Sequence, residues 1–147
     1  MSLIKDNRDK LASMQASQID CIKLSRAGHN KLALVACLVN GSRLQLSNPQ
    51  FEFQIRNGIS SLYVTKHLPK MIARQFVSVA NGYACINMAN VSSFETEDFG
   101  SSRMVNINAK FESGNSVRLY SVPTIEQGHE IAKLSKLFST GESEIEP

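Results

Sequence analysis

"LALVACLVNGSRLQLS", residues 32–47, has the pattern of a β-hairpin. On either side of Asn40 and Gly41, every second residue is leucine or alanine. A period of two puts these side chains on one face of a strand, and an Asn-Gly pair fits the tight turn between two antiparallel strands. The predicted apolar face consists of Leu32, Leu34, Ala36, Leu38, Leu44 and Leu46.

Two further Asn-Gly pairs lie between strand-like segments. Residues 76–80 (FVSVA) and 83–88 (YACINM) flank the pair at 81–82, and we expect a hairpin there. Residues 51–56 (FEFQIR) and 59–65 (ISSLYVT) flank the pair at 57–58, with aromatic and β-branched residues that favour strands. A helix is the alternative for this segment, because Phe51, Ile55, Ile59 and Leu62 also follow helical spacing, although Gly58 would then lie in its interior.

The second half of the chain adds three more strand-like segments. They are residues 90–98 (NVSSFETED), 104–112 (MVNINAKFE) and 116–121 (SVRLYS), with a loop around Ser113 and Gly114 before the last. Together these patterns predict an α+β protein that is mainly β, with about ten short antiparallel strands arranged in hairpins.

Helices are expected near both ends of the chain. Thr124 and Gln127 have the spacing of a capping box, and an apolar stripe follows up to Gly141, through Ile131, Leu134, Leu137 and Phe138. Residues 3–14 form either an amphipathic helix, through Ile4, Leu11 and Met14, or a mobile arm.

The segment 65–74, TKHLPKMIAR, contains a proline that restricts any helix there. Pro69 is tolerated only in a first helical turn, so we expect a helix from Leu68 to Arg74 or Gln75. Lys66 and His67 would then lie in a loop. The apolar residues of this helix, Leu68, Met71 and Ile72, would pack on the sheet.

The domain organisation expected is an N-terminal helix or arm (1–17), one compact β-rich domain (18–140) and an acidic flexible tail (141–147). A shift of 73 residues superimposes the hairpin at 32–46 on residues 105–119, with Gly41 over Gly114. Two similar units, 18–65 and 76–138, would explain this match. Chance is the alternative, since any two amphipathic hairpins share the same alternation.

Several classes of protein do not fit the sequence. No stretch approaches the roughly 18 apolar residues that span a bilayer, and the N-terminal MSLIKDNRDK is charged where a secretory signal is apolar. We therefore expect a cytoplasmic protein with no membrane partner. Cys21, Cys37 and Cys85 lie among apolar residues, as reduced and buried thiols do. No metal-binding spacing of Cys and His occurs, and neither a metal nor a cofactor is expected.

Charge is distributed unevenly along the chain. Residues 21–94 contain eight basic side chains and one acidic one, a surplus of seven positive charges, whereas the whole chain carries +3. Such a surplus attracts phosphates or an acidic partner. The candidate nucleic-acid-binding residues are Arg43, Arg56, Lys66, Lys70 and Arg74.

Residues 76–138 are similar in strand order to the DNA-binding domain of LytTR-type bacterial response regulators. Asn87 after an apolar strand, Val91 and the Gly114 turn match that pattern, over less than half of the chain. The resemblance implies a compact β fold that reads DNA through loops and strand ends. Ala80 and Asn81 replace the basic His-Arg pair that the family has there.

Two functions remain from the sequence. The first is a small non-enzymatic binding protein, nucleic-acid-associated or regulatory, whose basic middle region contacts DNA or RNA. The alternative is a protein–protein assembly or adaptor module that forms homo-oligomers through exposed sheet edges. An enzyme is not expected, because the clustered carboxylates Glu95, Glu97 and Asp98 have the pattern of a solvated loop after a strand.

Overall fold

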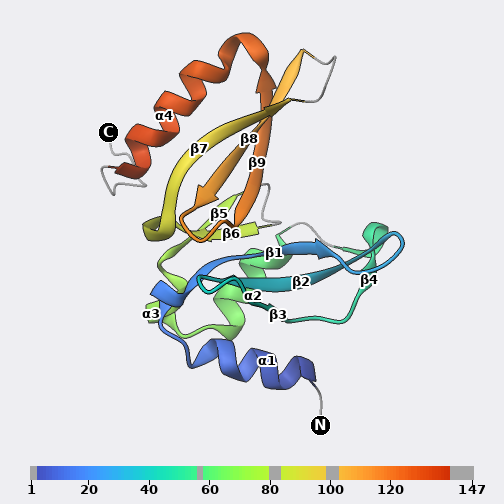
Figure 1. Ribbon diagram of the computed structural model, residues 1–147. Coiled ribbons are helices and arrows are strands. Elements are labelled where there is room, and N and C mark those ends of the chain that lie inside the picture. Colours follow the sequence, from blue (N-terminus) through green and yellow to red (C-terminus); the bar gives the residue numbers. More distant parts are fainter. Residues whose placement is uncertain (1–2, 56–57, 80–83, 99–102, 140–147) are drawn as a thin grey trace.

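The computed structural model describes residues 3–55, 58–79, 84–98 and 103–139. It confirms an α+β protein made mainly of antiparallel strands, with a helix near each end (Figure 1). Nine strands are present in the described residues, where about ten were predicted. The acidic tail predicted for 141–147 lies outside the described residues.

The strands form two sheets. The large sheet has the order β3-β2-β1-β6-β5, and β4 pairs with β2 beside it. The small sheet has the order β7-β8-β9. The strands are β1 (Ile19–Arg26), β2 (Lys31–Leu38), β3 (Arg43–Gln45), β4 (Gln50–Phe51), β5 (Phe76–Val79), β6 (Ala84–Asn87), β7 (Val91–Asp98), β8 (Met104–Phe111) and β9 (Ser116–Pro123).

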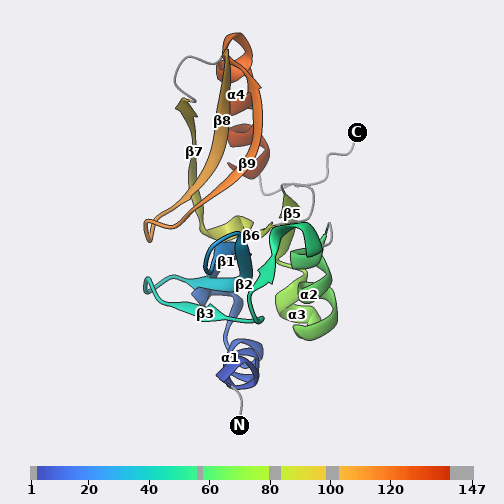
Figure 2. The same ribbon diagram turned by 90° about the vertical axis from the view of Figure 1, so that its right-hand side faces the viewer.

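In the described residues, four α-helices and several short 3-10 turns accompany the sheets. Helices α1, α2 and α3 lie below the large sheet, whereas α4 runs along one face of the small sheet, which stands above it (Figures 1 and 2). The helices are α1 (Leu3–Ala12), α2 (Ile59–His67), α3 (Lys70–Ala73) and α4 (Gln127–Ser139), and the described 3-10 turns are η1 (Ala16–Gln18), η2 (Glu52–Gln54), η4 (Met88–Asn90) and η5 (Thr124–Glu126).

The predicted hairpin at 32–46 is confirmed as β2 and β3, but its turn is longer than expected. The Gly41 amide donates to the Leu38 carbonyl, and the Leu38 amide donates to the Ser42 carbonyl. This is a three-residue loop in which Gly41, with φ of 90°, takes the left-handed position. An Asn-Gly pair therefore marks the turn correctly without forming the two-residue type.

The hairpin predicted around Asn57 and Gly58 is wrong, because residues 59–67 form helix α2. Gly58 does not lie inside this helix but precedes it as the N-cap, with φ of 78°. Because Gly58 lies outside the helix interior, it does not lower the stability of α2 as an interior glycine would. Tyr63 and Val64 are buried below the large sheet, so tertiary packing outweighs their preference for strands.

The other strand predictions agree with the structure. Strands β5 and β6 pair antiparallel as predicted, and the turn at 81–82 lies outside the described residues. Strands β7, β8 and β9 form an antiparallel meander. The C-terminal helix is present, but the Thr124 hydroxyl donates to the Arg103 carbonyl at 2.8 Å and makes no capping box.

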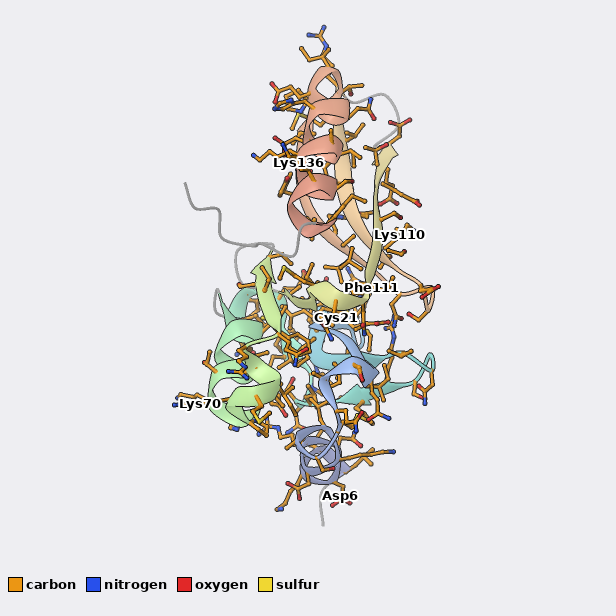
Figure 3. All side chains as sticks on the ribbon, turned by 90° about the vertical axis from the view of Figure 1, so that its left-hand side faces the viewer. Asp6, Cys21, Lys70, Lys110, Phe111 and Lys136 are labelled. Carbon is orange, nitrogen blue, oxygen red and sulfur yellow. The ribbon has the colours of Figure 1, made fainter. Side chains whose placement is uncertain are left out.

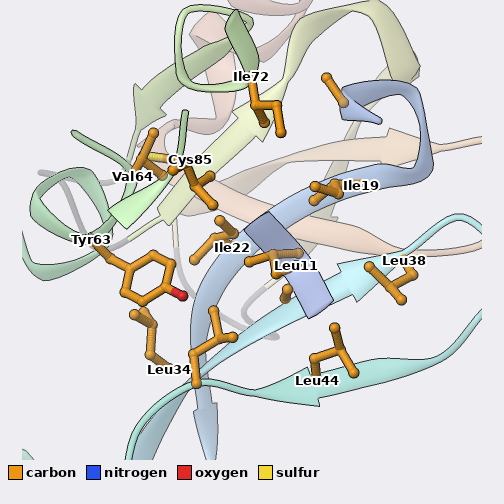
Figure 4. Packing of buried hydrophobic residues seen from close by; sticks show 14 residues of the cluster. Leu11, Ile19, Ile22, Leu34, Leu38, Leu44, Tyr63, Val64, Ile72 and Cys85 are labelled. Atoms are coloured by element: carbon orange, nitrogen blue, oxygen red, sulfur yellow. The ribbon is translucent and has the colours of Figure 1, made fainter. Parts of the chain in front are cut away.

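The large sheet is buried on both faces. Leu34, Ala36 and Leu38 of β2 belong to a core shared with α1, α2 and α3, part of which Figure 4 shows. Val35 and Cys37 point up into a second core shared with β6, the small sheet and Leu134 of α4. Two-sided burial explains why residues 32–38 are apolar throughout rather than alternating with polar residues.

The two three-stranded meanders, β1-β2-β3 and β7-β8-β9, have matching registers. In the first meander Val35 pairs with Gln45, and in the second Asn108 pairs with Arg118. The residue numbers of the second pair are those of the first plus 73. The strand register shifts after the first residue of β1 and also after the first residue of β7, at positions 72 residues apart. The turns match as well, because the Gly114 amide donates to the Phe111 carbonyl and Gly114 has φ of 102°.

Candidate functional site

Three of the predicted phosphate-binding residues lie on consecutive helical segments below the large sheet. Lys66 is in the last turn of α2, Lys70 begins α3, and Arg74 follows α3. All three are exposed, and Figure 3 shows Lys70 directed away from the rest of the chain. The prediction that Lys66 and His67 lie in a loop is wrong, because α2 continues to His67 and Pro69 is the N-cap of the separate helix α3.

The packing of this segment differs from the prediction at one residue. Leu68 and Ile72 are buried, as expected. Met71 was expected to pack on the sheet, yet 71% of its surface is exposed. In a helix of one turn, neighbouring residues point in different directions, so Met71 and Ile72 cannot both face the sheet.

Arg43 lies apart from these three residues. It is on β3, on the opposite side of the lower half of the molecule from α3 (Figure 2). Its guanidinium donates to the Ser25 hydroxyl at 3.1 Å. Nearby on β1, the Lys23 ammonium donates to the Ser116 carbonyl of β9 at 2.9 Å. The fifth predicted residue, Arg56, lies outside the described residues.

None of the four described candidates, Arg43, Lys66, Lys70 and Arg74, forms an ion pair with another described residue. Two ion pairs, Lys5–Asp9 and Lys133–Glu130, lie in α1 and α4. These four cations are exposed and are not neutralised by an acidic side chain of the described residues, so a phosphate can approach them.

Sequence reasoning missed a group beside β2. Phe51 and Phe53 alternate as if they formed the buried face of a strand, but 41% and 84% of their surfaces are exposed. Their rings stack, with centroids 5.6 Å apart and planes within 8° of parallel. The Lys31 ammonium lies 4.8 Å from the centroid of the Phe51 ring. Pro49, just before this pair, is the sequence signal that could have separated it from a regular strand.

A polar cluster joins the two sheets. The carboxylate of Asp20, which is 1% exposed, accepts hydrogen bonds from the Ser113 hydroxyl, the Asn115 amide at 2.8 Å and the Asn90 amide at 3.1 Å. The Asn115 amide also donates to the Leu38 carbonyl at 3.1 Å. These bonds hold the turn between β8 and β9 against the start of β1.

The cysteines and the clustered carboxylates are the groups with potential chemistry. All three cysteines are buried and none is in a disulfide, and Cys21 pairs with Cys37 across β1 and β2. The hydrogen bond between these two thiols lowers the pKa of Cys37 to about 7 and raises the pKa of Cys21. Glu95, Glu97 and Asp98 lie in strand β7, not in the predicted loop.

Comparisons with protein-family models, curated proteins and solved structures find no match for this chain. The resemblance to LytTR-type domains therefore rests on the sequence pattern alone. In the structure, residues 76–138 are divided between the two sheets. No helix in the described part of the chain is long and apolar enough to cross a membrane.

Proposed function

We propose that this protein is a non-enzymatic binding protein that associates with nucleic acid through the cations around its large sheet. The observation that carries the proposal is the surplus of seven positive charges in residues 21–94, combined with the exposure of Arg43, Lys66, Lys70 and Arg74. Phosphate contacts of this kind supply sequence-independent affinity that weakens as salt rises.

Fluorescence anisotropy with labelled DNA and RNA, titrated from about 50 mM to about 200 mM salt, tests this proposal. Wild type should bind at low salt and weaken steeply as salt increases. Lys70→Glu with Arg74→Glu should weaken binding and reduce the salt slope by about 0.7 to 0.9 for each phosphate that the variant no longer neutralises. Unchanged circular dichroism would show that the fold is retained.

The matched control places the same charge change in the small-sheet half, with Arg103→Glu and Lys133→Glu. This control should bind more tightly than the Lys70 and Arg74 variant. The proposal is rejected if wild type fails to bind at low salt, if binding is insensitive to salt, or if both double variants weaken it equally.

The second candidate function is homo-oligomeric assembly through a sheet edge, and strand β5 favours it. Among the described residues β5 pairs only with β6, and its sequence, FVSV, contains no charge or proline. The opposite edge is partly covered, because Asn7 and Arg8 of α1 donate to the Gln45 and Leu46 carbonyls at 3.0 and 2.7 Å. An uncharged, unpaired edge can add a strand from another chain.

Light scattering at several protein concentrations tests this second function. Wild type should be a dimer or larger, and Ser78→Lys, which places a charge at an exposed position of β5, should shift it toward the monomer. Ser42→Lys, at an exposed turn residue, is the control. A wild-type monomer at every concentration would reject assembly through β5.

We also propose that the two meanders are copies of one duplicated β unit. The matching registers, irregularities and turns support this proposal better than the shared alternation does, because alternation alone does not fix register. The copies now differ in surroundings, since α1 and α2 cover one and α4 covers the other.

A further inference from the structure

Phe51 and Phe53 are held in place by the neighbouring backbone. Strand β4 pairs with the start of β2, with Lys31 opposite Phe51. The Glu52 amide then donates to the Asn30 carbonyl at 3.1 Å, and the 3-10 turn η2 follows. These interactions fix the backbone on both sides of Phe51, so the ring pair is presented in a defined orientation.

Packing inside the chain does not account for Phe53. Its side chain is the most exposed phenylalanine or tyrosine among the described side chains, and its ring stacks on that of Phe51. Burial of an aromatic ring is favourable in water, and most of the Phe53 ring remains exposed. A flat ligand that stacks on Phe53 would extend the ring pair and cover its open surface.

The charges beside the ring pair favour an anionic ligand. Lys31 lies against Phe51 and forms no ion pair with a described residue. Arg26 and His29 are exposed in the same β1–β2 hairpin. Glu52 lies between the two phenylalanines and is the one acidic residue of the segment 21–94. Its negative charge would weaken the binding of an anion there. Aromatic rings next to cations are the combination that binds unpaired bases and their phosphates.

We propose that Phe53, supported by Phe51 and Lys31, stacks on an unpaired base of single-stranded nucleic acid. The inference rests on the proposed function and narrows it to single strands, since the ring faces of bases in a duplex are already stacked. Stacking tolerates any base, so the site selects unpaired structure rather than sequence. Lys31 would contact the adjoining phosphate.

Intrinsic fluorescence can report stacking at this position directly, because the chain contains no tryptophan. Phe53→Trp introduces a single indole, whose emission an oligothymidylate or an oligouridylate should quench to saturation. Ile125→Trp, at a residue that is 93% exposed in η5, is the control and should not respond. Comparing the two oligonucleotides separates DNA from RNA as the preferred ligand.

Anisotropy measurements with variants that carry no added tryptophan then give the energetic contribution. Phe53→Ala should weaken single-strand binding by about 5-fold to 100-fold, whereas Phe53→Tyr should retain it and duplex binding should change little. Glu52→Gln should strengthen single-strand binding, because it removes the opposing charge. Phe53 is so exposed that its replacement should leave the thermal unfolding midpoint unchanged.

The possible failures distinguish the inference from the proposed function. If wild type binds with the expected salt dependence but Phe53→Ala binds single strands equally well, the stacking site is rejected and the function stands. If wild type binds duplexes but not single strands, the stacking site is likewise rejected and the proposed function stands. If wild type binds no nucleic acid, both are rejected, and a change in oligomeric state on Phe53→Ala would assign the ring pair to protein contact.

Discussion

The hydroxyl of Tyr120 donates to the Glu130 carboxylate at 2.7 Å and ties β9 to α4. Partial burial, followed by this hydrogen bond, raises the pKa of Tyr120 above its ordinary value of 10.0. A raised folded-state pKa means that the contribution to stability is complete below about pH 10 and is lost as pH rises further.

Tyr120→Phe should therefore lower the free energy of unfolding by about 1 kcal/mol near pH 7. The difference from wild type should shrink above about pH 10, because wild type alone has this hydroxyl to deprotonate. Urea denaturation of both proteins across this range measures the effect. A difference that stays constant with pH would show that the hydrogen bond is not its source.

Tyr63 presents the opposite case, since its hydroxyl is buried without a hydrogen-bond partner among the described residues. Its ring lies against Arg8, with the guanidinium carbon 5.4 Å from the ring centroid, and that interaction does not need the hydroxyl. Tyr63→Phe should leave the free energy of unfolding unchanged or raise it by up to about 1 kcal/mol, as urea denaturation would show. A clear loss of stability would mean that a buried water satisfies the hydroxyl.

At the scale of elements, the turns of the two meanders allow a matched comparison. Gly41 and Gly114 both have positive φ, and a Cβ atom at either position would meet nothing within 4 Å. Alanine should therefore cost backbone strain without a clash, about 1 to 2 kcal/mol at each site. Urea denaturation should give similar losses for Gly41→Ala and Gly114→Ala.

Gly128→Ala is the control for the turn variants. Gly128 lies in α4, where alanine has the higher helix propensity, and its Cβ would also meet nothing within 4 Å. The same chemical change should then stabilise the protein by up to about 1 kcal/mol. Unequal losses at Gly41 and Gly114 would contradict the expectation that the two turns are equivalent.

Turn residues and alternation are sufficient to predict β2 and β3, the β7-β8-β9 meander and the β5–β6 pair. They fail at residues 51–65, where the short-range pattern favours strands over the alternative helix, but packing of Tyr63 and Val64 below the sheet decides for a helix at 59–67. Phe51 and Phe53 are missed for a related reason, since alternation indicates a shared face but not whether that face is covered. The cations can be identified individually, but their separation between β3 and α3 depends on sheet order, which sequence spacing does not encode.

At the scale of the molecule, the surplus of basic side chains lies in the large-sheet half. Residues 21–94 form most of the large-sheet half and contain eight basic side chains and one acidic one, whereas the described residues 95–98 and 103–139 contain six acidic and five basic ones. An electric field of this polarity would orient the molecule as it approaches a polyanion, with the large-sheet half leading. This separation of charge has a fixed direction in the folded protein only if the large-sheet half and the small-sheet half keep a fixed orientation relative to each other.

Asp20 is the polar group that we expect to maintain that relation. Cys21 of the large sheet and Phe111 of the small sheet belong to one apolar cluster and lie close together in Figure 3. Asp20, the residue before Cys21, is buried, and its three donors belong to η4 and to the β8–β9 turn. Asp20→Ala would leave these donors without their acceptor and should lower the free energy of unfolding by about 3 kcal/mol. Urea denaturation measures this loss.

Hydrogen exchange shows whether the loss is local to the junction. The Phe111 amide, which donates to the Asn115 carbonyl at 3.0 Å, should exchange faster in Asp20→Ala, whereas amides in the β1–β2 pair should keep their relative protection. Ser92, which corresponds to Asp20 at the 72-residue shift, is exposed, and Ser92→Ala should cost less than about 0.5 kcal/mol. Equal losses from both variants, or uniform acceleration of exchange, would mean that apolar packing between the sheets holds the halves together without Asp20.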